Sequence, residues 1–129
     1  MVKSKLIMAE KILVVDDEET IRDLFREYLS QEGFLVKAAS SGQAALELIK
    51  KENFDLLLID LLMPAMDGLE LVRQVREMGN ETVVAILSAY EIELDKSREE
   101  FLKIRDFIPK GIPLAEVSRK IKEIFREAA

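Results

Sequence analysis

The sequence feature that most constrains the fold is a short apolar run, Leu-Leu-Leu-Ile at residues 56–59, which ends abruptly in Asp60. An uninterrupted apolar run of this length is typical of a strand that is covered on both faces in the middle of a parallel sheet. Pro64 and Gly68 then break the chain into a loop. Because open α/β sheets bind ligands at the carboxyl ends of their strands, Asp60 lies where chemistry is expected.

Similar short apolar runs alternate with helical patterns along the rest of the chain. Strands are predicted at residues 12–15, 34–38, 56–59, 83–87 and 107–108. Apolar residues that recur every three or four positions predict helices around residues 21–29, 45–49, 69–78, 91–104 and 114–125. Gly33 is predicted to stop the first helix, and Pro113 suits the start of the last.

Five repeats of strand and helix predict an α/β fold, a doubly wound (βα)5 domain with helices on both faces of a parallel sheet. Right-handed crossovers leave few topologies, and the strand order 2-1-3-4-5 is the common one for five strands. In that order the first, third, fourth and fifth strands end side by side. Five polar residues, which follow or close these strands, should then converge on one cleft: Asp16, Asp17, Asp60, Ser88 and Lys110.

The composition excludes several classes of site. The 129 residues suit one domain, and the lack of cysteine and histidine removes disulfides, thiolate sites, the usual zinc ligand and a phosphohistidine donor. A net charge of −6 argues against direct contact with nucleic acid or an anionic membrane. No apolar run is long enough for a membrane span or a signal peptide, so a cytoplasmic location is expected. We expect residues 1–10 to be a leader and residues 11–129 to form the domain.

The predicted cleft favours phosphoryl chemistry. Three neighbouring carboxylates repel one another unless a cation joins them, and an oxygen-only site suits Mg²⁺. Asp60 can attack phosphorus to give an aspartyl phosphate. Phosphoryl transfer needs mainly positioning and charge neutralisation, which Lys110 and the Ser88 hydroxyl can provide at the phosphoryl oxygens.

Four segments in order resemble the receiver domain of bacterial two-component response regulators. They are Ile-Leu-Val-Val-Asp-Asp-Glu at 12–18, Asp-Leu-Leu-Met-Pro-Ala-Met-Asp-Gly at 60–68, Leu-Ser-Ala at 87–89 and Asp-Phe-Ile-Pro-Lys at 106–110. The resemblance extends from residue 11 to about residue 125. It implies a flavodoxin-like fold and a phosphorylation-dependent signalling switch, whose partner is a sensor histidine kinase or a phosphotransfer protein.

The resemblance also implies a role for each site residue. Asp60 would be the phosphorylated acid and Lys110 its catalytic partner, and Ser88 and Phe107 would switch together. Mg²⁺ would bind to Asp16, Asp17, Asp60 and the backbone carbonyl of Leu62. The signal would leave through the surface of the fourth helix, fifth strand and last helix, around Lys103, Phe107 and Val117, toward a downstream protein or a second copy in a homodimer.

The sequence departs from the family pattern at three places. Gly111 follows Lys110 where the family usually has proline, and Lys103-Ile104 replaces the usual Gly-Ala step. Ser88 stands where threonine is commoner. Two bulky residues, Leu62 and Tyr90, are expected to flank the phosphoryl group, and neither can orient an attacking water. Slow self-dephosphorylation is therefore predicted, and no conventional enzyme activity.

Each candidate residue also has a simpler explanation. Asp60 could cap the loop, Asp16 and Asp17 could cap the first helix, Lys110 and Ser88 could be ordinary surface and strand-end residues, and Phe107 could be static core. An aspartate-nucleophile phosphatase would need a second acid at position 62, and a flavin carrier would need a glycine- and hydroxyl-rich loop in place of residues 16–19. The alternative function is a phosphorylation-independent interaction module of the same fold.

Overall fold

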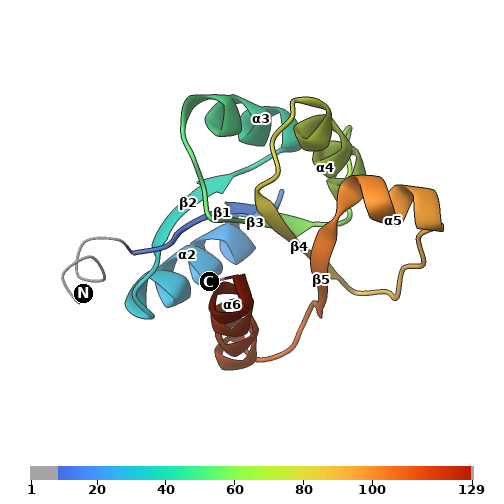
Figure 1. Ribbon diagram of the computed structural model, residues 1–129. Helices are drawn as coiled ribbons and strands as arrows, with labels where there is room; N and C mark the ends of the chain where they lie inside the picture. The colour runs from blue at the N-terminus through green and yellow to red at the C-terminus, as the bar shows by residue number, and fades with distance from the viewer. Residues whose placement is uncertain (1–8, 129) are drawn as a thin grey trace.

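The computed structural model describes residues 9–128, in which five strands alternate with five helices (Figure 1). The strands are β1 Lys11–Val15, β2 Leu35–Ala39, β3 Leu56–Asp60, β4 Val83–Ser88 and β5 Ile104–Pro109. The helices are α2 Glu19–Gln31, α3 Gly42–Lys51, α4 Gly68–Glu77, α5 Lys96–Leu102 and α6 Leu114–Ala128. Most of the predicted leader lies outside the described residues. Between residues 9 and 128 no helix is long and apolar enough to cross a membrane.

The five strands form one parallel sheet in the order β2-β1-β3-β4-β5, which confirms the predicted topology. In the register of the central strands, Ile59 lies beside Val15 and Asp60 beside Leu87. Ser88 in turn pairs with Pro109. This register brings the carboxyl ends of β1, β3, β4 and β5 to one edge of the sheet, as the site prediction requires.

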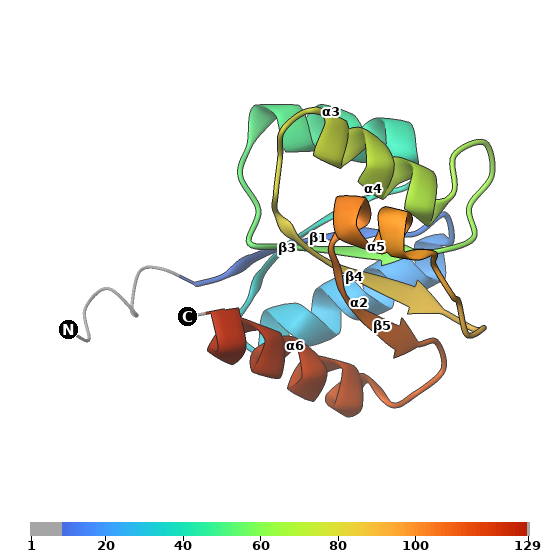
Figure 2. The same cartoon turned by 45° about the vertical axis from the view of Figure 1, so that its right-hand side comes forward.

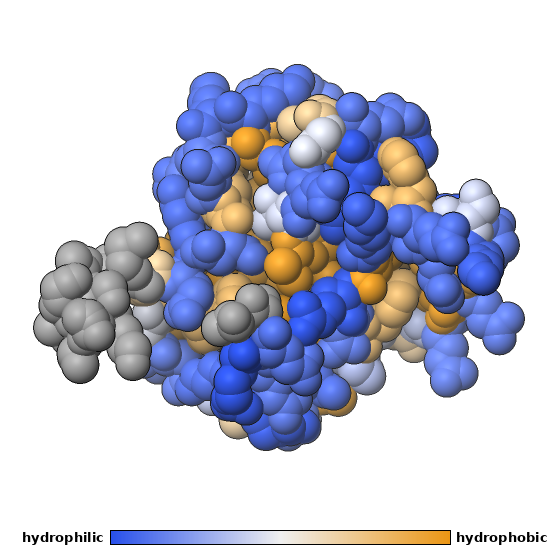
Figure 3. Space-filling model, viewed as in Figure 1, coloured by the Kyte–Doolittle hydropathy of each residue, from blue (hydrophilic) through white to orange (hydrophobic). Residues whose placement is uncertain are grey.

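The sheet lies between two layers of helices, with α3, α4 and α5 on one face and α2 and α6 on the other (Figure 2). Successive side chains of a strand point to opposite faces, so β3 supplies both layers of the core. Leu57 and Ile59 pack under α3 and α4, whereas Leu56 and Leu58 pack against α2 and α6. All five residues of β3 are buried, which explains why its sequence shows no alternation. From the viewpoint of Figure 1, hydrophilic residues cover the helices and apolar residues are visible between them (Figure 3).

Side-chain caps mark the starts of three helices. Ser41 accepts a hydrogen bond from the Ala44 amide at the start of α3, and Asp67 accepts one from the Glu70 amide at the start of α4. Asp95 caps α5 in the same way. Each cap satisfies an amide that has no partner within the helix, which favours the observed starting point.

The fourth helix is much shorter than the predicted range of residues 91–104. It begins at Lys96, because Asp95 accepts a hydrogen bond from the Arg98 amide, and it ends where Lys103 adopts a left-handed conformation with φ of 51°. Ile104 belongs to β5 and pairs with Val84, so its assignment to the helix was wrong. Residues 89–95 form no helix.

Three apolar residues lie elsewhere than predicted. Leu24 belongs to the apolar spacing that predicted the helix of residues 21–29 and a buried position, but it is 46% exposed. Met78, at the end of α4, is 42% exposed. Val117 was placed on the predicted output surface, yet it is 2% exposed and packs in the core beneath α6. It therefore cannot contact a partner in this conformation.

Candidate functional site

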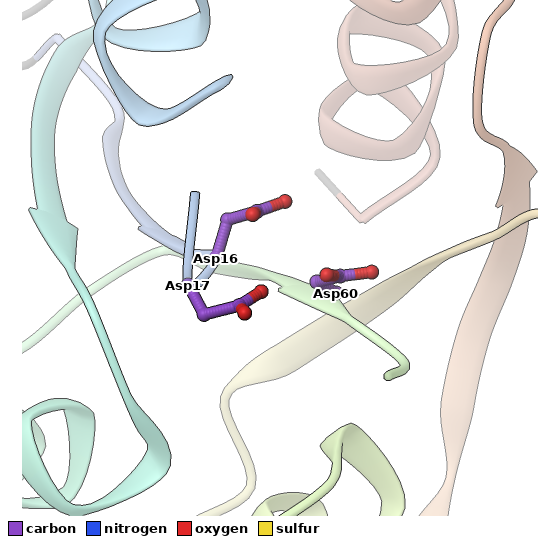
Figure 4. Close-up of side chains that lie close together, drawn as sticks. All are labelled: Asp16, Asp17 and Asp60. Carbon is purple, nitrogen blue, oxygen red and sulfur yellow. The ribbon is translucent and has the colours of Figure 1, made fainter. Parts of the chain in front are cut away.

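The five polar residues predicted to converge do meet at the carboxyl edge of the sheet. Asp16 and Asp17 directly follow β1, whereas Asp60 is the last residue of β3. Ser88 closes β4, and Lys110 follows β5. One carboxylate oxygen from each of the three aspartates lies within 4.8 Å of the others. Figure 4 shows these carboxylates extending from neighbouring strand ends into the same space.

Lys110 brings a positive charge to these acids. Its Nζ lies 3.1 Å from Oδ1 of Asp60 and 3.6 Å from Oδ2 of Asp16. Its backbone amide donates to the Ser88 carbonyl, which continues the pairing of β4 and β5 beyond the last strand residue. The side chain is 29% exposed. Lys110 thus lies beside two buried acids, whereas the simpler explanation was an ordinary surface lysine.

Asp16 is fully buried, and its two carboxylate oxygens have different surroundings. Oδ1 accepts a hydrogen bond from the Glu18 amide at 2.9 Å, which shapes the turn before α2. Oδ2 accepts no hydrogen bond from the described residues. A buried carboxylate oxygen without a donor is costly unless a cation lies beside it. Turn formation therefore explains the position of Oδ1 only. Oδ2, which lies 3.6 Å from the Lys110 ammonium, remains open to a metal ion.

The electrostatics of the cleft favour a bound cation. Burial raises the pKa of Asp60, and the neighbouring charges of Asp16 and Asp17 raise it further, while Lys110 opposes both effects. Burial also acts to lower the pKa of Lys110, but its contacts with Asp60 and Asp16 outweigh burial and leave that pKa raised. Lys110 thus stays charged and offsets one of three negative charges. The remaining excess and the oxygen-only donor set fit a hard divalent ion such as Mg²⁺.

The loop after Asp60 depends on a glycine that approaches the site closely. A Cβ on Gly68 would lie 2.6 Å from the carbonyl oxygen of Asp60, too close for any other residue. The Gly68 amide donates to the Leu61 carbonyl at 2.7 Å and closes the loop onto the end of β3. The sequence predicted only a chain break at this glycine, because the contact joins residues that are separated by a loop.

Ser88 and Phe107 line the same cavity beside the site. The Ser88 hydroxyl donates to the Tyr90 carbonyl at 2.6 Å and accepts from the Tyr90 amide at 3.0 Å. It is therefore held in a local turn in this conformation. Phe107 is partly buried against the core, and with Ser88 and Tyr90 it lines a cavity of about 480 Å³.

Exposed apolar residues surround the cleft. Leu62 and Tyr90, predicted to flank the phosphoryl group, are 61% and 68% exposed. A groove of about 280 Å³, which sequence reasoning missed, runs between α2 and the segment that follows Lys110. Leu24 and Ile112 line it from opposite sides. The sequence hinted at this groove only through the wide apolar pattern of residues 21–29. In the structure, the buried residues of α2 are Phe25 and Leu29, so part of that apolar pattern is left for the groove.

Comparison with known proteins identifies a family. Residues 12–122 match the family model of the response regulator receiver domain. The chain is 34% identical over 119 residues to the response regulator MprA of Mycobacterium ulcerans, covering 92% of this chain and 51% of MprA. It is 38% identical over 119 residues to the transcriptional regulatory protein ResD of Bacillus subtilis, covering 92% and 49%. The chain thus spans about half the length of the curated relatives that it matches.

Solved structures agree with this result. The chemotaxis protein CheY4 of Vibrio cholerae superposes with a TM-score of 0.82 at 25% identity, over 90% of this chain and 98% of CheY4. The response regulator TrrA of Thermotoga maritima, solved in complex with Mg²⁺ and BeF, gives a TM-score of 0.77 at 31% identity, over 88% and 97%. The matched region includes every residue of the acidic cluster and Lys110. The chain belongs to the response regulator receiver domain family.

Proposed function

We propose that Asp60 accepts a phosphoryl group and that this modification switches the domain between two signalling states. The observation that carries the proposal is the position of Lys110, whose Nζ lies 3.1 Å from the Asp60 carboxylate at the edge of the acidic cluster. A lysine there can neutralise a phosphoryl oxygen as a point charge. The phosphate would thus form next to a fixed positive group.

The residues at the site fit a resident Mg²⁺ ion. Asp16, Asp17 and Asp60 would supply carboxylate oxygens, and the backbone of Leu62 would supply a carbonyl. The support is the spacing of the carboxylates and Oδ2 of Asp16, which accepts no hydrogen bond from the described residues and lies 3.6 Å from the Lys110 ammonium. When bound, the ion supplies positive charge that offsets the charge of the phosphoryl oxygens. TrrA, the relative solved with Mg²⁺ and BeF, is consistent with this assignment.

The transfer itself requires a single displacement. An oxygen of the Asp60 carboxylate attacks phosphorus, and an acyl phosphate forms as the bond from phosphorus to the donor nitrogen breaks. The electron pair of that bond stays on the donor histidine, which leaves as neutral imidazole when its other ring nitrogen carries a proton, so no external base or oxidant is needed. Lys110 then pairs with the new phosphate, having been held beside the attacking carboxylate beforehand.

The switch would operate through Ser88 and Phe107. The Ser88 hydroxyl now donates to the Tyr90 carbonyl, and phosphate on Asp60 would offer it a competing, charged acceptor. Only one of the two arrangements benefits from phosphorylation, so phosphorylation shifts the population toward it. Because Phe107 lines the same cavity as Ser88, we propose that it moves with the hydroxyl.

We propose that the phosphodonor is a sensor histidine kinase or a phosphotransfer protein, in the cytoplasm, and that it docks on the apolar groove beside Lys110. The groove and the acidic cluster share this lysine, so a helix that covers Leu24 and Ile112 could bring its histidine to Asp60. The output would use α5, β5 and the exposed side of α6, toward a protein partner or a second copy of the chain. The net charge of −6 argues against nucleic acid contact by this domain.

Incubation with acetyl phosphate and Mg²⁺, followed by intact-mass measurement, tests the proposal. The wild type should gain one phosphoryl group, and Asp60→Asn should gain none. Asp55→Asn is a matched control, because this acid precedes the same strand at its other end, where it accepts a hydrogen bond from the Lys11 amide. Absence of any mass gain together with absence of Mg²⁺ binding would instead favour a phosphorylation-independent interaction module.

A further inference from the structure

The two ends of α5 are held very differently. At its start, the helix follows residues 89–95, which form no regular structure and of which 89–93 line the cavity next to Ser88. At its end, Leu102 is 3% exposed and packs into the core. The chain then turns directly into β5. A short helix whose end is anchored in the core, and whose capped start follows irregular chain, can pivot about the anchored end.

Arg76, near the end of α4, provides the anchor. Its Nε donates to the carbonyl oxygen of Leu102 at 2.7 Å, and one terminal nitrogen donates to that of Lys103 at 3.2 Å. The other terminal nitrogen donates to the carbonyl oxygens of Asn80 and Thr82 at 3.1 and 2.8 Å. One guanidinium therefore joins the end of α5 to the loop between α4 and β4.

The hydrogen-bond acceptors of Arg76 are all of one kind. Every hydrogen bond that its guanidinium makes with the described residues goes to a backbone carbonyl. Burial lowers the pKa of Arg76, and Glu81 opposes this effect only in part. The Leu102 carbonyl lies at the end of α5, where no amide of the helix can donate to it. The charged guanidinium of Arg76 supplies the missing donor.

The backbone at Lys103 is a second sign of constraint. Its φ of 51° lies in the left-handed region, which disfavours residues other than glycine, asparagine and aspartate. Such a conformation persists where surrounding contacts enforce it. The Lys103 amide donates to the Glu99 carbonyl, and its own carbonyl accepts from Arg76, so both sides of the peptide are held.

From these contacts we infer that Arg76 is a positioning residue, which fixes the end of α5 and confines the conformational response of this region to residues 89–98. The inference extends the proposed function, since the response it confines is the one that phosphorylation of Asp60 would cause. Arg76 lies at the end of α4, whereas Asp67 and Gly68 at its start adjoin the site. The anchor is therefore separate from the chemistry.

Hydrogen exchange measured by mass spectrometry tests this inference in the full chain, with and without Mg²⁺ and beryllofluoride as a phosphate analogue. In the wild type without analogue, amides 99–104 should exchange at least tenfold more slowly than amides 89–95. Arg76→Gln should remove that difference, and Arg76→Lys should restore part of it through a single ammonium. Arg73→Gln is the matched control on the same helix, since the ion pairs of Arg73 with the described residues are to Glu70 and Glu77 of α4 itself and reach neither α5 nor the following loop.

The analogue then separates positioning from simple stabilisation. Among residues 89–104 of the wild type, its effect should be limited to residues 89–98, and in Arg76→Gln the effect should spread to 99–104. Equal exchange of amides 89–95 and 99–104 in the wild type would overturn the inference. It would also be overturned if, in Arg76→Gln, the effect of the analogue on this segment stayed within residues 89–98. If the analogue has no effect on any wild-type amide, the proposed function fails, and the comparison without analogue still decides whether Arg76 anchors the helix.

Discussion

Replacing Asp60 with Asn should stabilise the metal-free protein. At an effective dielectric constant of about 20, a like-charged pair 4.8 Å apart costs about 3 kcal/mol, and the Lys110 contact at 3.1 Å contributes about 5 kcal/mol. Asp16 is buried, but Asp17 is exposed, so solvent weakens its share of the repulsion. Attraction and repulsion thus nearly cancel, and burial of the charged Asp60 carboxylate decides the sign.

The expected gain in the free energy of unfolding is about 1–2 kcal/mol, because burying a carboxylate costs several kcal/mol and Lys110 offsets only part of that cost. For a chain of this length the gain corresponds to a rise in Tm of roughly 3–6 °C. Asparagine keeps an oxygen that can accept from Lys110. Thermal and urea unfolding in EDTA, followed by circular dichroism, would measure the change, with Asp55→Asn as the control.

The gain should depend on pH with a definite sign. The pKa of Asp60 is raised in the folded protein, so ionisation of this carboxyl opposes folding. The opposition is complete above the folded-state pKa and disappears as pH falls below the unfolded value of about 3.9. The stability advantage of Asp60→Asn should therefore be largest near neutral pH and shrink on acidification. Mg²⁺ should stabilise the wild type more than the variant. An Asn variant that is less stable in EDTA at neutral pH, or a difference that is independent of pH, would refute this reasoning.

Three further variants test other parts of the account. Leu62→Asn with Tyr90→Glu should shorten the lifetime of the phosphorylated protein severalfold, since water would gain a polar route to phosphorus; an equal or longer lifetime would contradict the predicted shielding. Leu24→Gln should slow transfer from the cognate kinase about tenfold and leave acetyl phosphate labelling unchanged, and equal slowing of both would argue against docking in the groove. Gly68→Ala should lower the free energy of unfolding by about 2–3 kcal/mol in urea titrations, because its Cβ would collide with the Asp60 carbonyl; a neutral effect would show that the loop can shift.

Much of the fold was predictable because one strand carried a strong signal. Residues 56–59 are apolar without alternation, since β3 is covered on both faces, and this identified a central strand. The alternation of strands and helices then predicted the strand order that the structure shows. The site followed from topology, because the ends of neighbouring parallel strands must meet at one edge. That reasoning correctly placed Lys110 beside Asp60, although the two residues are far apart in the sequence.

The parts that sequence reasoning missed depend on contacts between distant residues. Residues 91–95 alternate between acidic and apolar positions, and the Asp95 cap, which determines where α5 begins, was read as part of the helix. The turn in which Ser88 bonds to Tyr90 leaves no mark on the apolar pattern. Leu24 has the spacing of a core residue, but it is 46% exposed among residues 9–128. Composition and periodicity report burial on average, and they do not report these individual contacts.

The most direct test of the account identifies the residue that carries the phosphoryl group. After labelling with acetyl phosphate and Mg²⁺, reduction with sodium borohydride converts an aspartyl phosphate to homoserine, and peptide mass spectrometry reads its position. The account predicts homoserine at residue 60. Homoserine at another position, or none in protein whose mass had increased by one phosphoryl group, would contradict it.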